Sequence, residues 1–207
     1  MRAPAMILFR DCQHLLQGGS IRTGFRLGAG ERLDLALCCS DGGGEAVLDI
    51  DIDGPDAQLN LYGLYLCSGT DSLNIKVNLR HNCGGSNSFQ LFKGIVKDSA
   101  RAVFDGLVMV APEAQKTEAL QTNRNLLLSE GAMVQSSPQL EIYADDVKCS
   151  HGATSGNLSP DEQFYMRSRG ISLAQARRLQ MISFLAPVAE HFPEDCREHF
   201  SKILEQW

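Results

Sequence analysis

The residues best suited to carry chemistry are a cysteine and a histidine two positions apart, Cys149 and His151. If this segment is extended, both side chains point to one face, about 6.5 Å apart along the chain. A thiolate and an imidazole so placed suit zinc or iron–sulfur chemistry better than calcium or magnesium. These two residues would supply only half of the ligands of a metal or cluster site. The other ligands would have to come from elsewhere in the chain or from a second chain. On spacing alone, such a pair is more often structural or incidental.

A second pair, His81 and Cys83, has the mirrored spacing and is a weaker candidate source of metal ligands. The segment from Asp49 to Gly54 matches the start of a calcium loop, with aspartates at alternate positions. The match fails at the twelfth position, where a calcium loop has a bidentate glutamate and this chain has Asn60. We therefore expect the three aspartates to lie on the solvated face of a strand.

Other familiar signatures are missing from the sequence. The triple glycine at residues 42–44 lacks the Lys-Ser/Thr of a phosphate-binding loop and predicts a turn. The sequence contains neither a G-x-S-x-G nucleophile elbow nor the H-E-x-x-H spacing of zinc proteases. The common nucleotide, hydrolase and metalloprotease motifs therefore give no alternative site.

The composition describes one soluble domain with its own core. The chain has 207 residues, 43% of them hydrophobic and 21% charged, and a formal net charge of −6. This acidic balance argues against a nucleic-acid partner. The N-terminal residues form neither a signal peptide nor a membrane span. Seven cysteines without a paired spacing predict free thiols, and therefore a cytoplasmic protein.

The elements expected to position these residues begin with short strands between Glu45 and about Val110. In the segment from Leu73 to Arg80, apolar and polar residues alternate strictly, as in a half-buried strand. Apolar centres recur about every 13 to 16 residues, which leaves no room for a helix between strands. An antiparallel sandwich or barrel remains possible on this pattern, but the even spacing favours a solenoid whose turns stack on one another.

After Ser155 the pattern becomes helical. Ser159 and Pro160 predict the start of a first helix, and Gly170 its end. A second capping box, Ser172 with Gln175, predicts the next helix.

The later helical positions predict which faces are buried. We expect one buried face in the second helix, formed by Leu179, Ile182, Leu185 and Val188, and a kink or end at Pro187. A last helix is expected from Pro193, with an apolar stripe formed by Cys196, Phe200, Ile203 and Leu204. This stripe is expected to pack on the chain's own helices, with a partner groove as the alternative.

Between Ser88 and Arg178, six segments together are more specific than any single motif: Phe89–Gly94, Arg101–Gly106, Ala114–Thr117, Gln121–Leu128, Pro138–Thr154 and Phe164–Ile171. Taken in this order, they resemble the SufB/SufD family of iron–sulfur cluster assembly proteins. The motif Lys-Cys-Ser-His-Gly-Ala-Thr at residues 148–154 is similar to SufD rather than SufB.

The resemblance implies a mainly β fold, with a right-handed parallel β-helix over residues 1–155 and a small α-helical domain over residues 156–207. It also implies a non-catalytic scaffold subunit that works with a SufB-like subunit and a SufC-like ATPase. Cys149 and His151 then become candidate ligands of a nascent cluster at the SufB interface. The cluster is transient in the complex, and no cofactor is held stably by the isolated chain. The resemblance further implies that the C-terminal helices dock the ATPase, with candidate contacts at Phe164, Arg167, Phe200, Ile203 and Trp207.

By the resemblance, we expect the chain to begin inside the family pattern, either as a fragment or as a relative with a shortened N-terminal part. We therefore expect residues 1–45 to cap the solenoid imperfectly or to take part in self-association, such as a homodimer. One rival is a structural β-helix interaction protein that is not engaged in cluster assembly. Another is a polysaccharide-active β-solenoid enzyme, for which Asp145, Asp146 and the aspartates of residues 49–53 are the available carboxylates.

Overall fold

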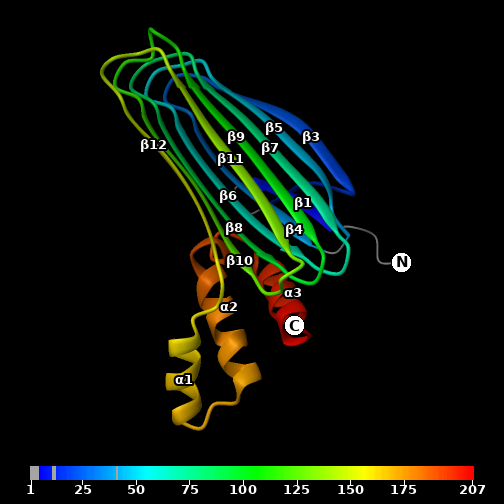
Figure 1. Cartoon of the computed structure of the whole chain (residues 1–207). Coiled ribbons are helices and arrows are strands. Elements are labelled where there is room, and N and C mark those ends of the chain that lie inside the picture. Colours follow the sequence, from blue (N-terminus) through cyan, green and yellow to red (C-terminus); the bar gives the residue numbers. More distant parts are fainter. Residues whose placement is uncertain (1–4, 11–12, 41) are drawn as a thin grey trace.

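The computed structural model describes residues 5–10, 13–40 and 42–207, with the backbone alone for residue 5 and residues 13–18 (Figure 1). In this part of the chain, twelve strands precede three helices. The strands are β1 (Ala5–Arg10), β2 (Gln13–Gly18), β3 (Ser20–Leu27), β4 (Arg32–Ser40), β5 (Gly44–Ile52), β6 (Gln58–Cys67), β7 (Ser72–His81), β8 (Asn87–Val96), β9 (Arg101–Val110), β10 (Glu118–Leu127), β11 (Met133–Ile142) and β12 (Lys148–Gly156). The helices are α1 (Pro160–Ser168), α2 (Leu173–Ala189) and α3 (Glu194–Glu205).

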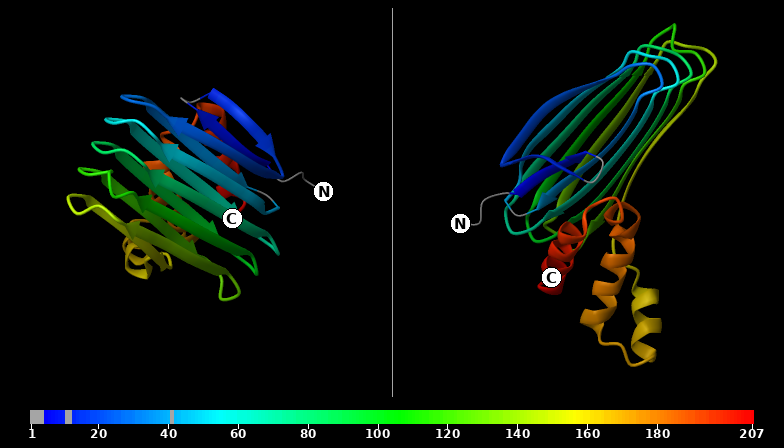
Figure 2. Two further views of the ribbon diagram at one scale, coloured as in Figure 1. Left: turned by 90° about the horizontal axis from the view of Figure 1, so that it is seen from above. Right: turned by 180° about the vertical axis from the view of Figure 1, so that it is seen from behind.

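From β3 onward the strands form a parallel solenoid of about five turns. Odd-numbered strands make a five-stranded sheet in the order β11-β9-β7-β5-β3, and even-numbered strands make the facing sheet. Residues paired one turn apart are 25 to 32 residues apart in sequence, for example Ser20 with Glu45 in the first turn and Arg101 with Met133 in the last. Each turn therefore contributes one rung to each sheet, and the stack is visible from above in Figure 2. The predicted solenoid is confirmed, and the antiparallel sandwich or barrel is excluded.

The interior between the two sheets holds the first of two apolar clusters, here called the interior cluster. Along β7 the side chains alternate as predicted: Ile75 and Val77 are buried, whereas Asn74 and Lys76 are exposed. Phe92 and Phe104 meet across the interior with ring centroids 4.7 Å apart. Other members are Leu35, Leu48, Ile50, Leu61, Leu73 and Leu79. Alternating strands thus fill the solenoid with packed side chains.

A second apolar cluster, here called the outer cluster, joins α2 and α3 to the outer face of the seven-stranded sheet. It consists of Phe9, Ala36, Cys38, Leu64, Leu66 and Ile95 from the strands, and Met181, Leu185, Val188, Phe192, Cys196, Phe200, Ile203 and Leu204 from the helical part. Because both faces are covered here, the residues from Phe92 to Val96 form an unbroken buried run. Within it, the ammonium of Lys93 donates to the carbonyl of Phe184, 2.6 Å away.

The helix starts agree with the sequence signals. Ser159 and Ser172 each accept a backbone N–H of the first turn, and Gly170 after α1 has a φ of +87°. The predicted face of α2 is half wrong: Leu185 and Val188 are buried, but Leu179 and Ile182 are 48% and 36% exposed. Steps of three drift by about 60° each around a helix of 3.6 residues per turn, so four such residues do not share a face.

Two further expectations concern the ends of helices and of the solenoid. Pro187 lies inside α2, which ends two residues later at Ala189, so the helix is not interrupted at the proline itself. At the N-terminal end, β1 pairs antiparallel with both β4 and β2, and thus extends the seven-stranded sheet. Residues 1–4, 11–12 and 41 of the expected N-terminal cap lie outside the described residues. The change from strands to helices falls between Gly156 and Pro160.

One buried polar pair crosses the interior near the ends of the strands. His81 is fully buried, and its Nε2 lies 2.9 Å from the hydroxyl oxygen of Ser88. Burial lowers the pKa of His81 to about 4 from its ordinary value of 6.5. The imidazole is therefore neutral at physiological pH, as expected for a core histidine.

The outer cluster predicts how the helices are attached. Leu185→Ala should lower the free energy of unfolding by about 2–5 kcal/mol, because it removes a buried side chain and leaves a cavity. Leu179→Ala, on the exposed side of the same helix, should change it by less than about 0.5 kcal/mol. Urea unfolding followed by circular dichroism measures both. Equal effects of the two variants would contradict the described docking of α2.

His81 predicts a pH dependence of stability. Between pH 6.5 and about 4 the unfolded chain binds a proton that the folded chain excludes, so stability is complete above this window and falls as the pH drops through it. From pH 7 to pH 5 the loss from this group should be about 2 kcal/mol. In His81→Gln this loss should be absent, so the stability of the variant should fall less between pH 7 and pH 5 than that of the wild type. Parallel pH profiles of variant and wild type would show that His81 is not buried as described.

Candidate functional site

Cys149 and His151 lie near the start of β12, the last strand of the seven-stranded sheet. β12 pairs in parallel with β10, and in the described part of the chain its other edge pairs with no strand. Cys149 is in register with Ala119, and His151 with Gln121, through an unbroken ladder. The segment is extended, as the Cys-x-His argument assumed. The pair lies toward the end of the solenoid that is remote from the helices, since β12 runs from there to α1 (Figure 1).

Both side chains belong to the interior face of the sheet. Their register partners Ala119 and Gln121 are buried inside the solenoid, and Cys149 packs against the interior cluster. Because no further rung covers β12, Cys149 is only partly buried and His151 is exposed. Burial raises the pKa of the Cys149 thiol, and a backbone hydrogen bond at Ala119 offsets part of this rise. The thiol is therefore protonated until a bound metal ion displaces its proton to solvent.

Next to His151 and further along β10 the interior of the solenoid is polar, a feature that the sequence reasoning missed. Gln90, Gln121, Asn123 and Asn125 are all buried. The Gln121 amide donates to Gln90 Oε1 at 3.1 Å, and Asn123 Nδ2 donates to Ser136 Oγ at 3.0 Å. The hydroxyl of Tyr65 donates to Asn123 and Asn125. The sequence signal was present: residues 121, 123 and 125 are amides at alternate positions, which places them on one face of a strand.

The second predicted pair is not close to the first. His81 is bonded to Ser88, and Ser88, Ala119 and Cys149 occupy the same column on three successive rungs. Two rungs correspond to about 9.5 Å, so His81 and Cys149 do not share a metal ion. Cys83 lies in the turn that follows β7 and is partly exposed. Among the described residues, no group of three or more His, Cys, Asp or Glu side chains is arranged to hold a metal ion.

The aspartates of the apparent calcium loop all accept hydrogen bonds from other side chains of this chain. Asp49 accepts from Asn78, Asp51 from Arg80, and Asp53 from Asn82. The first two bonds connect neighbouring rungs on the outer face of the five-stranded sheet, and the third lies just beyond the ends of β5 and β7. The interpretation of these residues as a polar strand face is thereby supported.

The predicted partner contacts divide into two groups. Phe164 is 74% exposed on α1, and Arg167 on the same helix is also exposed. Phe200 and Ile203 are only 3% and 8% exposed within the outer cluster, so in this fold their side chains pack inside the chain. An amphipathic stripe must be buried, and here it packs on α2 within the outer cluster.

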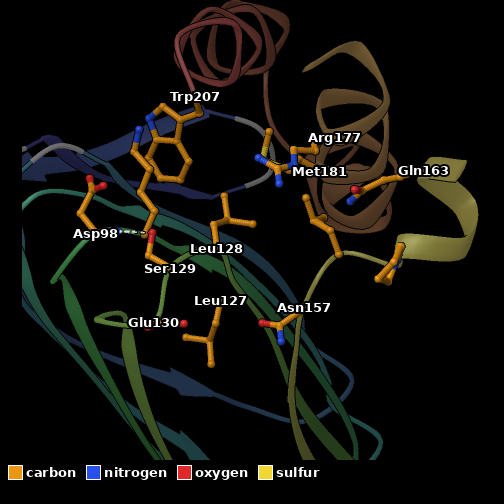
Figure 3. Close-up of a pocket in the computed structure, with 13 residues that line it drawn as sticks. Asp98, Leu127, Leu128, Ser129, Glu130, Asn157, Gln163, Arg177, Met181 and Trp207 are labelled. Carbon is orange, nitrogen blue, oxygen red and sulfur yellow. Dashed lines mark hydrogen bonds between the residues drawn. The ribbon is translucent and has the colours of Figure 1, made fainter. Parts of the chain in front are cut away.

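Trp207 borders a cavity of about 580 Å³ between the solenoid and the helices (Figure 3). Its indole ring lies under the Lys97 ammonium, 4.4 Å from the ring centroid. Leu128 from the turn after β10, and Arg177 and Met181 from α2, line the same cavity. The predicted contact residue Trp207 is thus partly covered by its own chain. No helix in the described residues is long and apolar enough to cross a membrane.

Comparisons with known proteins agree with this geometry. Residues 43–184 match the family described as SUF system FeS cluster assembly, SufBD core domain. The chain is 45% identical over 139 residues to the iron-sulfur cluster assembly protein SufD of Escherichia coli K12. The aligned stretch covers 67% of this chain and 33% of that relative. The chain is 43% identical over 159 residues to protein ABCI7, chloroplastic, of Arabidopsis thaliana, which covers 73% of this chain and 33% of that relative.

A SufBD family protein of Synechocystis is 47% identical over 117 residues, which cover 56% of this chain and 25% of the relative. The chain thus spans a third or less of the length of these relatives. The family match covers most of the solenoid together with α1 and much of α2. This chain therefore belongs to the SufB/SufD family of iron–sulfur cluster assembly proteins and is SufD-like.

Proposed function

We propose that this protein is a non-catalytic scaffold subunit of a Suf complex, in which Cys149 and His151 help to hold a nascent iron–sulfur cluster at the interface with a SufB-like subunit. The observation that carries the proposal is the position of both residues on the interior face of the last strand, whose second edge pairs with no described strand. A second chain that covers this strand brings its own ligands next to them. The cluster is cargo, formed here and passed on.

The free edge of β12 supports a partner strand at this place. An unpaired edge presents a row of backbone N–H and C=O groups that a strand of another chain can bind. Two apolar side chains lie exposed close to it, Ile142 at 41% and Tyr143 at 61%. The same edge offers a place for a second copy of this chain, which is the homodimer alternative.

The chemistry required of the pair is modest. The Cys149 thiol loses its proton when iron binds, and the thiolate and a neutral imidazole then donate one electron pair each. Because two ligands from one chain hold iron weakly, the isolated chain should keep no stable cluster. A reducing compartment, the cytoplasm in our expectation, suits the six described cysteines, which are all free thiols.

A polysaccharide-active enzyme receives less support. Such an enzyme needs two free carboxyl groups that face each other across a sugar. The carboxylates of Asp49, Asp51 and Asp53 instead bind side chains of the next rung. We therefore favour the scaffold function.

The helix α1 is the best-supported place for docking a SufC-like ATPase. It packs against α2 and extends beyond the strands, away from both sheets (Figures 1 and 2). Phe164 and Tyr165 leave two aromatic side chains exposed on it, at 74% and 61%. Exposed aromatic pairs are typical anchors of protein interfaces.

The ligand role predicts the effect of two substitutions in the assembled complex. Cys149→Ser and His151→Ala should each lower the rate of cluster formation at least about 10-fold, because each removes a donor at the interface. Anaerobic reconstitution with iron and sulfide, together with bound iron per complex, measures this. Cys83→Ser and His199→Ala serve as matched controls outside the site. If both site variants form intact complexes and assemble clusters at the wild-type rate, Cys149 and His151 are not cluster ligands.

The docking role predicts a separate effect. Phe164→Ala should weaken binding of the SufC-like ATPase about 10-fold or more, while the stability of the chain stays the same. Titration calorimetry gives the dissociation constant. Ile142→Ala, an exposed residue at the opposite end of the solenoid, should leave ATPase binding unchanged. If Phe164→Ala binds like the wild type, α1 is not the docking helix.

A further inference from the structure

A column of side chains inside the solenoid leads directly to His151. In register on β6, β8, β10 and β12, it consists of Leu61, Gln90, Gln121 and His151. Neighbouring rungs are about 4.8 Å apart, so each side chain stacks on the next. The column changes from apolar to polar toward the last rung.

Gln121 is the member of this column next to His151, and its amide is only half satisfied. The residue is fully buried, and its Nε2 donates to Gln90 Oε1 at 3.1 Å. Its Oε1 finds no hydrogen-bond partner among the described residues. The oxygen and nitrogen of an amide point in different directions, so an Nε2 turned toward Gln90 leaves Oε1 free for the rung of His151. A buried acceptor without a partner is unfavourable, which favours a bond at this position.

The facing sheet fixes the position of the Gln121 amide. Gly106 on β9 is buried opposite it, and a Cβ atom there would lie 2.6 Å from Nε2 and 2.7 Å from Oε1 of Gln121. The absence of a side chain at Gly106 therefore provides the space that the amide occupies. Gln90 holds the amide from one side and Gly106 limits it from another, so its free oxygen has a defined place.

We propose that Gln121 is a positioning residue for His151, and that its Oε1 accepts the imidazole N–H when the ring turns toward the interior. This bond selects one tautomer and leaves the other ring nitrogen as the donor to iron. The inference deepens the proposed function, on which the purpose of the bond rests. The bond itself is a property of the folded chain and needs neither iron nor a partner.

The experiment measures the tautomer of His151 in the metal-free chain. Long-range ¹H–¹⁵N correlation spectra at a pH where the imidazole is neutral distinguish the two tautomers, and the His151→Ala variant assigns the signal. Wild type should show one dominant tautomer. In Gln121→Leu, which keeps the size but lacks the acceptor, the ring signals should move to those of the exposed His199. Gln121→Glu restores a carboxyl oxygen at the same place and should restore the single tautomer.

Asn123→Leu is the matched control, since it removes an equally buried amide on the same strand, in register with Ala153 and not with His151. It should leave the tautomer of His151 essentially as in wild type. Wild-type ring signals in Gln121→Leu, or an equal change in Asn123→Leu, would overturn the proposal. Circular dichroism and the signals of the other histidines verify the fold of each variant. The two proposals can fail separately. If the wild type shows one dominant tautomer but the His151→Ala variant still assembles clusters in the complex, Gln121 positions His151 and His151 is not a cluster ligand.

Discussion

The whole molecule depends on the parallel stacking of rungs, each of which satisfies the backbone hydrogen bonds of the next. This ladder needs a neighbour on both sides, so the last rung necessarily has a free edge and an interior face that nothing covers. β12 is that rung. A side chain on the interior face of an earlier strand is buried, whereas Cys149 and His151 on β12 combine an interior position with access from outside. The candidate site is thus a direct consequence of where the ladder stops.

The two sheets have different environments, and the difference explains how their strands look in sequence. The five-stranded sheet has a polar outer face, where Asp49 and Asn78 bind across rungs, so its strands alternate clearly. The seven-stranded sheet is covered by α2 and α3, and the end of β8 is buried on both faces. Lys93 is accommodated there because its ammonium reaches the Phe184 carbonyl. One sheet therefore faces solvent and the other carries the helical part.

Local patterns predicted much of this structure, and long-range packing accounts for what they missed. The alternation around Ile75 and the capping residues Ser159 and Ser172 act within a few residues, and these predictions are confirmed. The stripe with Phe200 predicted burial against the chain's own helices, and α3 does pack on α2, within a cluster that also includes the outer face of the sheet. The extended Cys-x-His pair was predictable from spacing. Gln121 was not, because an amide in an alternating strand usually faces solvent, and only the register of the solenoid shows it inside.

β12 continues after three residues into α1, so a single extended segment connects His151 to the helical part. A hydrogen-bonded strand responds differently to force in different directions. A pull along its axis loads all its bonds to β10 together, so the strand behaves as a stiff rod. A pull away from the sheet loads the bonds one at a time and peels the strand from the Gly156 end, so it reaches His151 and then Cys149 only near the end. The direction in which α1 is moved therefore decides whether the far end of the strand shifts as a unit or stays in place.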